Sequence, residues 1–195
     1  MRIGVTGIFA SGKGTVCELF RQMGAEVIDT DILAREITEP GHEALKKIID
    51  VFGKKYLNRD GTLDRRRFAR DVFSNSESTD LLNSITHPII LDLMLSRSSG
   101  PGTYMVNTPL LFESGFDKSM EKNIVVVARV DQAVERGKKR DGISGDEIKQ
   151  RLNHQLSLNE KIKLADYVID NSGTLENTRR QVIEIWNILK DMNNR

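Results

Sequence analysis

The sequence has little of what marks secreted or membrane proteins. Its 195 residues include a single cysteine, Cys17, so no internal disulfide can form and a reducing cytoplasm suits the chain. No apolar run approaches the length that spans a bilayer, which argues against a membrane partner. We expect the first strand to begin at Arg2, which leaves no room for a signal peptide. These absences together predict a cytoplasmic protein.

An excess of charge of one sign is also lacking. Lys and Arg number 29 while Asp and Glu number 28, and the net charge of +1 gives no global signal for a nucleic-acid partner. The histidines His42, His87 and His154 lack the spacing of metal ligands, so we expect no zinc site. Charge is uneven only locally, in basic clusters at 65–67 and 136–140.

The segment from Gly7 to Thr15, GIFASGKGT, contains the strongest motif. It fits G-x-x-x-x-G-K through Lys13 and then has Gly14, where a Ser or Thr would place its hydroxyl on Mg²⁺. A short apolar strand precedes it, and helical spacing follows in Val16, Leu19, Phe20 and Met23. Strand, loop and helix form a phosphate cradle, because helix N–H groups face the anion and Lys13 reaches the terminal phosphates. An ordinary βα turn is the alternative.

Four further apolar runs predict strands, at 25–28, 104–106, 124–130 and 167–169. Their near-continuous apolar character is typical of a parallel sheet that is covered on both faces. Segments of helical periodicity alternate with them, so the pattern favours an α/β fold with a five-stranded parallel sheet flanked by helices. Ligands of such folds bind at the carboxyl ends of the strands.

The stretch 32–102 between the second and third strands has no strand signal and is too long for a simple crossover. Apolar stripes with helical spacing predict a helical insertion there, for example in Leu45, Ile48, Ile49 and Phe52. Asp64 is a candidate cap for one of its helices. We expect a later helix of the insertion to be interrupted at His87-Pro88.

A second, smaller insertion follows the fourth strand at 136–157, and we expect it to form a lid. Ser144 and Glu147 have the spacing of a capping box. Arg136 and Arg140 lie one turn apart on a predicted helix, so both can close over phosphates and stabilise charge on a transferred group. A solvated basic face is the alternative, and Arg140 is favoured because a glycine turn follows it.

Carboxylates follow the second and third strands. Asp29 and Asp31 lie at the carboxyl edge beside the loop, where one can hold Mg²⁺ through water and the other can accept a proton. Asp29 can instead cap the helix that follows. Glu113 comes after the third strand, and it either acts at the ligand edge or fixes a nearby arginine.

Two further polar residues have a functional and a structural interpretation. His87 precedes a proline in the helical insertion, and a lone histidine is more often a structural hydrogen-bonding group than a ligand contact. Asn171 follows the last strand, where its amide can donate to and accept from a base edge. The alternative for Asn171 is a plain turn.

These segments, taken in order, resemble the dephospho-CoA kinase family along almost the whole chain. The resemblance rests on the phosphate loop and on a set of short motifs at fixed places: VIDTD at 27–31, AR at 34–35, EPG at 39–41, DGTLDR at 60–65, HP at 87–88, PLLFE at 109–113, KRDG at 139–142 and 165–173. Any one of these motifs is weak, but their order and spacing are specific.

The resemblance implies a P-loop kinase. Its nucleotide-binding core would comprise 1–31, 103–135 and 158–195, its CoA-binding helical insertion 32–102 and its lid 136–157. The implied reaction uses ATP and Mg²⁺ to phosphorylate the ribose 3′-hydroxyl of dephospho-CoA, a small-molecule substrate, in the last step of CoA synthesis. Nothing in the sequence specifies an oligomeric state.

The resemblance also implies roles for single residues. Lys13, Asp31 and Arg140 would be catalytic, with Asp31 as the base or hydroxyl-orienting group and Arg140 as the lid arginine. The ATP phosphates would be bound by Ala10, Ser11, Gly12, Lys13, Gly14 and Thr15, and Asn171 would lie near the adenine. Thr15 would be the residue nearest the metal, which is held largely through water. The acceptor site or its supporting shell would include Thr6, Arg35, His87 and Glu113.

The loop's departures from the usual family pattern, Gly-Gly-Ile-Gly-Ser-Gly-Lys-Ser-Thr, include Ile8, Ala10 and Gly14. Gly14 offers no metal ligand, but Lys-Gly-Thr also ends loops that resemble those of adenylate kinases, where water largely holds the metal. Asn107 stands where many relatives carry an acid. Two alternatives therefore stay open: a nucleoside or nucleoside-monophosphate kinase, and a non-catalytic nucleotide-binding regulator.

Overall fold

The computed structural model describes residues 1–142, 148 and 155–193, and it divides into two compact units. The first unit comprises Met1–Asp29 with Gly100–Arg195, and the second comprises Thr30–Ser99. Most of the expected lid, including the capping-box residues Ser144 and Glu147, lies outside the described residues.

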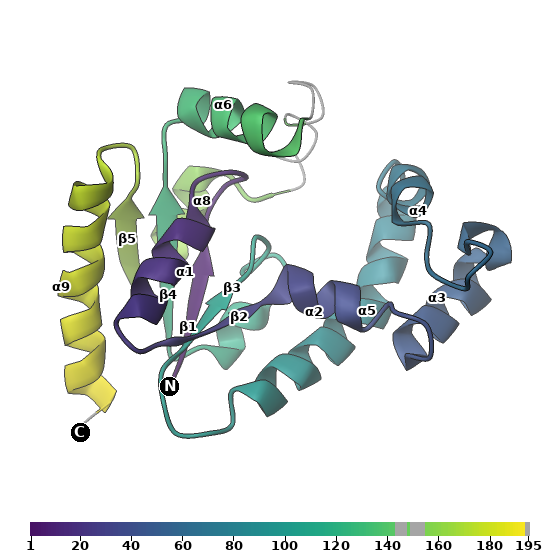
Figure 1. Ribbon diagram of the computed structural model, residues 1–195, viewed down its shortest axis with the longest axis horizontal. Coiled ribbons are helices and arrows are strands. Elements are labelled where there is room, and N and C mark those ends of the chain that lie inside the picture. Colours follow the sequence, from purple (N-terminus) through teal and green to yellow (C-terminus); the bar gives the residue numbers. More distant parts are fainter. Residues whose placement is uncertain (143–147, 149–154, 194–195) are drawn as a thin grey trace. The chain divides into compact units, whose positions relative to one another are not determined.

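The first unit contains a sheet of five parallel strands, as the sequence predicts (Figure 1). The strands are β1 (Arg2–Thr6), β2 (Glu26–Asp29), β3 (Tyr104–Asn107), β4 (Lys122–Val127) and β5 (Tyr167–Asp170), and their spatial order is β2-β3-β1-β4-β5. Because all neighbours pair in parallel, their carboxyl ends meet at one edge. The phosphate loop leaves β1 at that edge.

The fourth strand is shorter than the apolar run 124–130 predicts. It ends at Val127, which pairs with Asp170 at the end of β5. Beyond that pair no neighbouring strand continues, and Val130 instead begins helix α6 (Val130–Asp141) with its side chain exposed. The expectation of a strand to residue 130 was wrong because sheet pairing, and not apolar character, sets where a strand ends.

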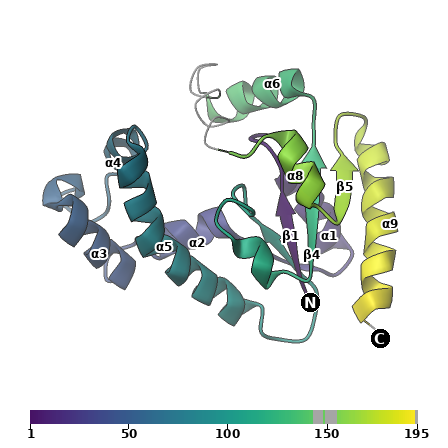
Figure 2. The same ribbon diagram turned by 180° about the vertical axis from the view of Figure 1, so that it is seen from behind.

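Helices cover both faces of the sheet. On one face α1 (Lys13–Gln22) and α9 (Leu175–Asn193) share a core with β1, β3, β4 and β5, and Phe20 packs against Trp186 with ring centroids 6.1 Å apart. On the other face α8 (Leu158–Leu164) packs against β4, and Figure 2 shows it in front of the sheet. A short 3₁₀ helix, Phe116–Ser119, precedes β4. No helix in the described part of the chain is long and apolar enough to cross a membrane.

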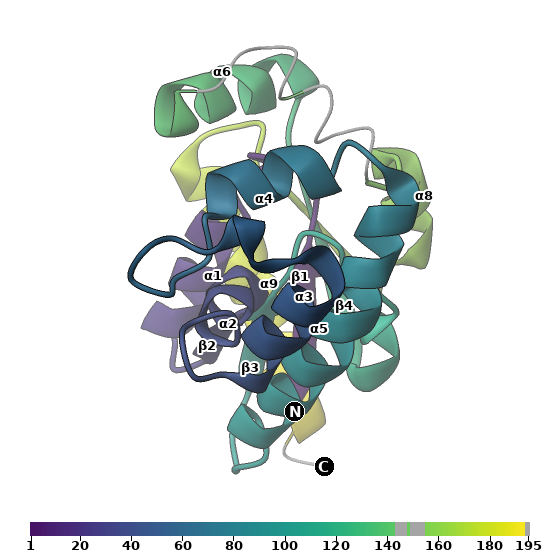
Figure 3. The same cartoon turned by 90° about the vertical axis from the view of Figure 1, so that its right-hand side faces the viewer.

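The second unit is entirely helical in its regular structure, as expected for the insertion. It contains α2 (Thr30–Glu36), α3 (Glu43–Phe52), a 3₁₀ turn at Lys54–Tyr56, α4 (Arg65–Val72) and α5 (Ser76–Arg97). The other α-helices pack around α5 (Figure 3). Asp64 caps α4 as predicted, since its carboxylate accepts a hydrogen bond from the Arg67 N–H at 3.1 Å.

Helix α5 runs without a break through His87-Pro88, so the expected interruption was wrong. A proline inside a helix lacks an N–H donor and usually bends or ends the helix. Here the buried side chains of Leu82, Thr86, Ile90 and Met94 recur every four residues on both sides of Pro88. Their packing stabilises a continuous helix against the local cost of the proline.

We predict that Leu189→Ala lowers the free energy of unfolding of the first unit by about 2–5 kcal/mol, because Leu189 is fully buried and its truncation leaves a cavity. Trp186, the single tryptophan, lies one turn away in the same core and reports the transition by fluorescence during denaturant unfolding. Ile188→Ala, at a neighbouring position that is 46% exposed, should change stability by less than about 0.5 kcal/mol. Equal losses for both variants would contradict this packing.

Candidate functional site

The loop between β1 and α1 needs glycine at two positions. Gly7 has φ +154°, and a Cβ there would lie 2.3 Å from the Val126 carbonyl oxygen. Gly12 has φ +96°, and a Cβ there would lie 2.0 Å from the Asn171 Nδ2 atom. Both distances are far below van der Waals contact, so the two glycines of the motif are fixed by close approach as well as by backbone conformation.

Helix α1 begins at Lys13, so its first N–H groups face the space beyond the strand ends. The Lys13 ammonium lies over the loop and donates to the carbonyl oxygens of Gly7 and Ile8 at 3.2 and 3.1 Å. Gly14 and Thr15 are exposed in the first turn, and a Cβ at Gly14 would meet nothing within 4 Å. Helix N–H groups beside a cation are the arrangement that binds phosphate.

Ala10 adopts the left-handed backbone conformation, with φ +55°. Among the residues that the structure describes, the others with positive φ are glycines. A side chain in this region costs about 1 kcal/mol relative to glycine. Ala10, where the family pattern has glycine, therefore keeps a glycine-like turn at the cost of a small strain.

Asn171 braces the loop from the end of β5. Its Nδ2 donates to the Ser11 carbonyl at 2.8 Å, and its Oδ1 accepts from the Thr178 hydroxyl on α9 at 3.0 Å. The side chain is buried and lies directly over Gly12. Asn171 therefore does more than form a turn, because its side chain holds the phosphate loop. Its position near an adenine stays a prediction.

Helix α6 brings Arg136 and Arg140 to the phosphate loop, and Figure 1 shows this helix beyond the carboxyl ends of the strands. An Arg136 Nη2 hydrogen bonds to the Asn171 carbonyl at 3.2 Å. The Arg140 guanidinium lies over the Phe9 ring, 5.3 Å from its centroid. Gly137 allows this approach, because a Cβ there would lie 2.5 Å from the Phe9 ring.

The ends of β2 and β3 place Asp29 beside Asn107. The two residues are partners in the strand register, and the Asn107 amide donates to the Asp29 carboxylate at 2.7 Å. Among the described residues no group of three His, Cys, Asp or Glu side chains gathers as a metal site. The Asp29 carboxylate is an oxygen ligand of the kind that Mg²⁺ accepts, and this ion needs few ligands from a protein when phosphates and water supply the others.

Three predicted site residues, Asp31, Arg35 and His87, belong to the second unit. Asp31 and Arg35 lie in the first and last turns of α2, both exposed. The Arg35 carbonyl accepts a hydrogen bond from Arg65 at 2.9 Å. His87 is half-buried on α5, and burial lowers the pKa of its imidazole. Because α2 and α5 pack together, the three residues share one small helical scaffold.

Lys161 on α8 is a functional candidate that sequence reasoning missed. Its side chain is fully buried, and its ammonium contacts the Glu113 carboxylate and the Pro109 carbonyl, both at 2.8 Å. It also lies 3.5 Å from the hydroxyl of Thr6, which is itself buried and donates to the Pro109 carbonyl. Burial lowers the pKa of Lys161, and the Glu113 carboxylate opposes that shift. One of the two interpretations of Glu113 had it fixing a nearby arginine, and the structure pairs it with a lysine.

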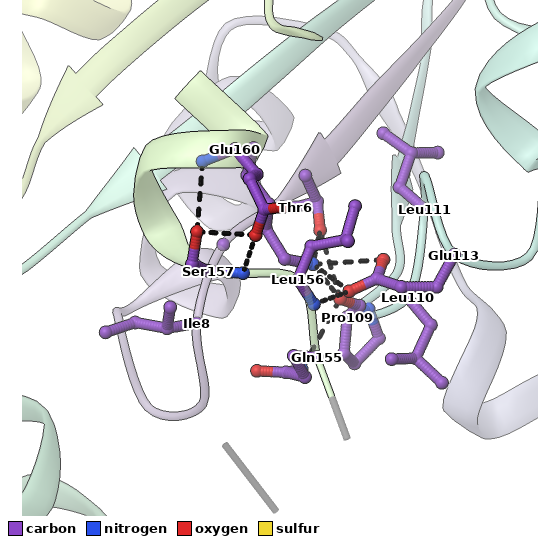
Figure 4. A network of polar contacts seen from close by, with 12 residues as sticks. Thr6, Ile8, Pro109, Leu110, Leu111, Glu113, Gln155, Leu156, Ser157 and Glu160 are labelled. Carbon is purple, nitrogen blue, oxygen red and sulfur yellow. Dashed lines mark hydrogen bonds and ion pairs between the residues drawn. The ribbon is translucent and has the colours of Figure 1, made fainter. Parts of the chain in front are cut away.

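The chain just before α8 joins the same group of contacts (Figure 4). The Leu156 N–H donates to Glu113 at 2.7 Å. The Gln155 Oε1 accepts from the Phe9 N–H in the phosphate loop at 3.1 Å, and its Nε2 approaches the Pro109 carbonyl at 3.4 Å. Nothing in the sequence marks Gln155 or Lys161, because their partners lie more than 40 residues away.

Comparison with protein families gives one match that spans most of the chain. The family model described as dephospho-CoA kinase matches residues 1–177. The dephospho-CoA kinase of Carboxydothermus hydrogenoformans is 43% identical over 188 residues, which cover 94% of this chain and 91% of that protein. The corresponding protein of Bacillus cereus is 40% identical over 195 residues, covering 96% and 98% of the two chains.

Solved structures give the same fold. The crystal structure of TT1252 from Thermus thermophilus aligns with a TM-score of 0.81 at 35% identity and covers 97% of each chain. The dephospho-CoA kinase from Campylobacter jejuni aligns with a TM-score of 0.71 at 29% identity and covers 98% of each chain. A shikimate kinase from Acinetobacter baumannii shares the fold alone, with a TM-score of 0.56 at 16% identity.

We predict that Gly12→Ala weakens nucleotide binding by about tenfold or more, because the new Cβ must displace the Asn171 amide and adopt a left-handed backbone. The matched control is Gly14→Ala, where the Cβ has open space and affinity should stay within about twofold. Equilibrium titration with a fluorescent ATP analogue measures both variants. Equal affinities for the two would show that the contact at Gly12 is not needed.

Proposed function

Because the chain belongs to the dephospho-CoA kinase family, we propose that it transfers the γ-phosphoryl group of ATP to the ribose 3′-hydroxyl of dephospho-CoA, giving CoA and ADP. The observation that carries the proposal is the phosphate loop at the carboxyl edge of a P-loop kinase sheet, with Lys13 and two arginines beside it. The single cysteine and the absence of membrane-spanning helices among the described residues support a cytoplasmic site of action.

The first unit provides the donor site. The loop from Ala10 to Thr15 offers backbone N–H groups to the ATP phosphates, and the Lys13 ammonium neutralises the terminal ones. Thr15 and Asp29 would hold Mg²⁺, largely through water, and the ion would supply neutralisation of the phosphate charge. Gly14 offers no hydroxyl for this purpose.

The basic side chains of α6 act on the charge of the transferred group. Phosphoryl transfer is chiefly a matter of positioning and charge stabilisation, and arginine suits both because its guanidinium donates in a planar fork. Arg140 is the catalytic arginine in this proposal, and Arg136 holds the Asn171 carbonyl beside the loop. Asn171 keeps the loop in shape and lies at the adenine end of the nucleotide.

The second unit provides the acceptor site. Asp31 accepts the proton of the 3′-hydroxyl or orients that hydroxyl toward the γ-phosphorus. A carboxylate can serve as a base or as an orienting group for the attacking hydroxyl in phosphoryl transfer. Arg35 and His87 bind the acceptor, and the helical insertion 32–102 holds the rest of it. Residues 136–157 form the lid. Thr6, which is buried, and Glu113, whose carboxylate pairs with Lys161, have a supporting role.

The reaction is tested by an ATP-dependent assay with dephospho-CoA, AMP, CMP and adenosine as separate acceptors, each with a Mg²⁺ titration. We expect turnover with dephospho-CoA alone and loss of turnover when EDTA removes the metal. Turnover of the nucleotides alone would assign the chain to the nucleoside or nucleoside-monophosphate kinases. ATP binding with no transfer to any acceptor would favour a non-catalytic regulator.

Donor and acceptor roles are separated by two substitutions. Lys13→Ala should weaken ATP binding about 10- to 100-fold, because it removes a charge-assisted contact to phosphate. Asp31→Asn should lower kcat about 100-fold while the Kd for ATP stays within about twofold. Asp191→Asn, an equal change of charge at an exposed position of α9, is the control and should alter neither value. An Asp31→Asn enzyme of normal kcat would exclude the proposed role.

A further inference from the structure

The buried contacts around Lys161 converge on one carbonyl and one carboxylate. The Pro109 carbonyl accepts from the Lys161 ammonium, the Thr6 hydroxyl and the Gln155 amide. The Glu113 carboxylate accepts from Lys161 and from the Leu156 N–H. Lys161 has three donor hydrogens, and three acceptors surround it, so the buried charge is both paired and hydrogen-bonded.

Such a pair is poorly explained by stability alone. Taking the Lys161 ammonium fully out of water costs several kcal/mol even beside the partly exposed Glu113 carboxylate, and an apolar side chain in its place is often as stabilising or more so. What an ion pair with three hydrogen bonds provides is geometry, because each bond restricts direction as well as distance. The restricted groups here are backbone atoms of the Pro109 loop and of the chain that enters α8.

The segment fixed by this pair reaches the phosphate loop. The Glu113 carboxylate accepts a hydrogen bond from the Leu156 N–H, and this contact fixes the position of the preceding residue, Gln155. The Gln155 amide then binds on two sides, as an acceptor from the Phe9 N–H and as a donor to the Pro109 carbonyl. Figure 4 shows Glu113, Pro109, Leu156 and Gln155 in one continuous network beside Thr6. All of these residues lie in the first unit, as the loop does.

We propose that the Lys161–Glu113 pair and Gln155 are positioning residues for the phosphoryl donor: the pair fixes the 155–156 backbone, and Gln155 fixes the loop at Phe9. This inference rests on the proposed function, since the loop is taken to bind ATP. It assigns Glu113 to the donor side, through the loop, and not to contact with the acceptor. Ala10, which has the left-handed backbone conformation, follows Phe9 directly, so the Gln155 contact restrains the loop next to its strained residue.

The first test is Gln155→Leu, which keeps a similar volume and removes both hydrogen bonds. We expect the Kd for ATP to rise about tenfold, the KM for ATP to rise with it, and the KM for dephospho-CoA to stay within about twofold. Gln22→Leu, at an exposed position near the end of α1, is the matched control. Unchanged ATP affinity in Gln155→Leu would overturn the proposal.

The second test addresses the ion pair. Lys161→Met and Glu113→Gln should both raise the Kd for ATP, with the smaller rise for Glu113→Gln because its amide oxygen still accepts from Leu156. The double variant should lose no more affinity than Lys161→Met, since the two groups act as one unit. Lys163→Met, an exposed lysine of the same helix, is the control and should match the wild type.

Thermal unfolding of every variant separates positioning from loss of structure. If Lys161→Met does not fold, Glu113→Gln and Gln155→Leu decide the matter. A rise in the KM for dephospho-CoA with unchanged ATP affinity would place Glu113 in the acceptor site and overturn the proposal. A wild-type protein that binds ATP but never phosphorylates dephospho-CoA would refute the proposed function, and the Kd series for ATP would still test the positioning roles.

Discussion

The site depends on how closely the Asn171 side chain approaches the phosphate loop. Its amide occupies the space where any side chain at Gly12 would stand, and it binds the Ser11 carbonyl on one side and Thr178 of α9 on the other. Asn171 directly follows β5, and its carbonyl accepts a hydrogen bond from Arg136 of α6, so the last strand, the last helix and the basic helix are all connected to the loop through one residue. A loop without regular hydrogen bonds thereby gains a fixed shape from three rigid elements.

The sheet and the helical insertion could be predicted from local sequence because their signals are local. Apolar runs mark all five strands, and the stripe from Leu45 to Phe52 marks α3. The errors occurred where distant packing outweighs local preference. Val130 leaves the sheet for lack of a partner strand, and Pro88 stays within α5 because buried neighbours on both sides hold the helix.

The candidate site divides in the same way. The loop and the arginine pair of α6 follow short patterns whose own residues lie a few positions apart, and such patterns can be seen in the sequence. Lys161 has no such pattern, since its partners Glu113 and Pro109 come from a distant loop, and an isolated lysine on a polar helix predicts a solvated side chain. Burial of a charge can be found only after the fold has been built.

The resting contacts of Lys13 have a consequence for nucleotide affinity. Its ammonium already has carbonyl oxygens of the loop as partners, so a phosphate does not take a fully hydrated cation from water. When a phosphate binds, its charged oxygens replace the neutral carbonyl oxygens around the Lys13 ammonium. Part of the water around that ammonium, whose removal would oppose binding, has already been displaced during folding. The loop should therefore select ligands with a high density of negative charge, because only these replace the Gly7 and Ile8 carbonyls as partners of the Lys13 ammonium.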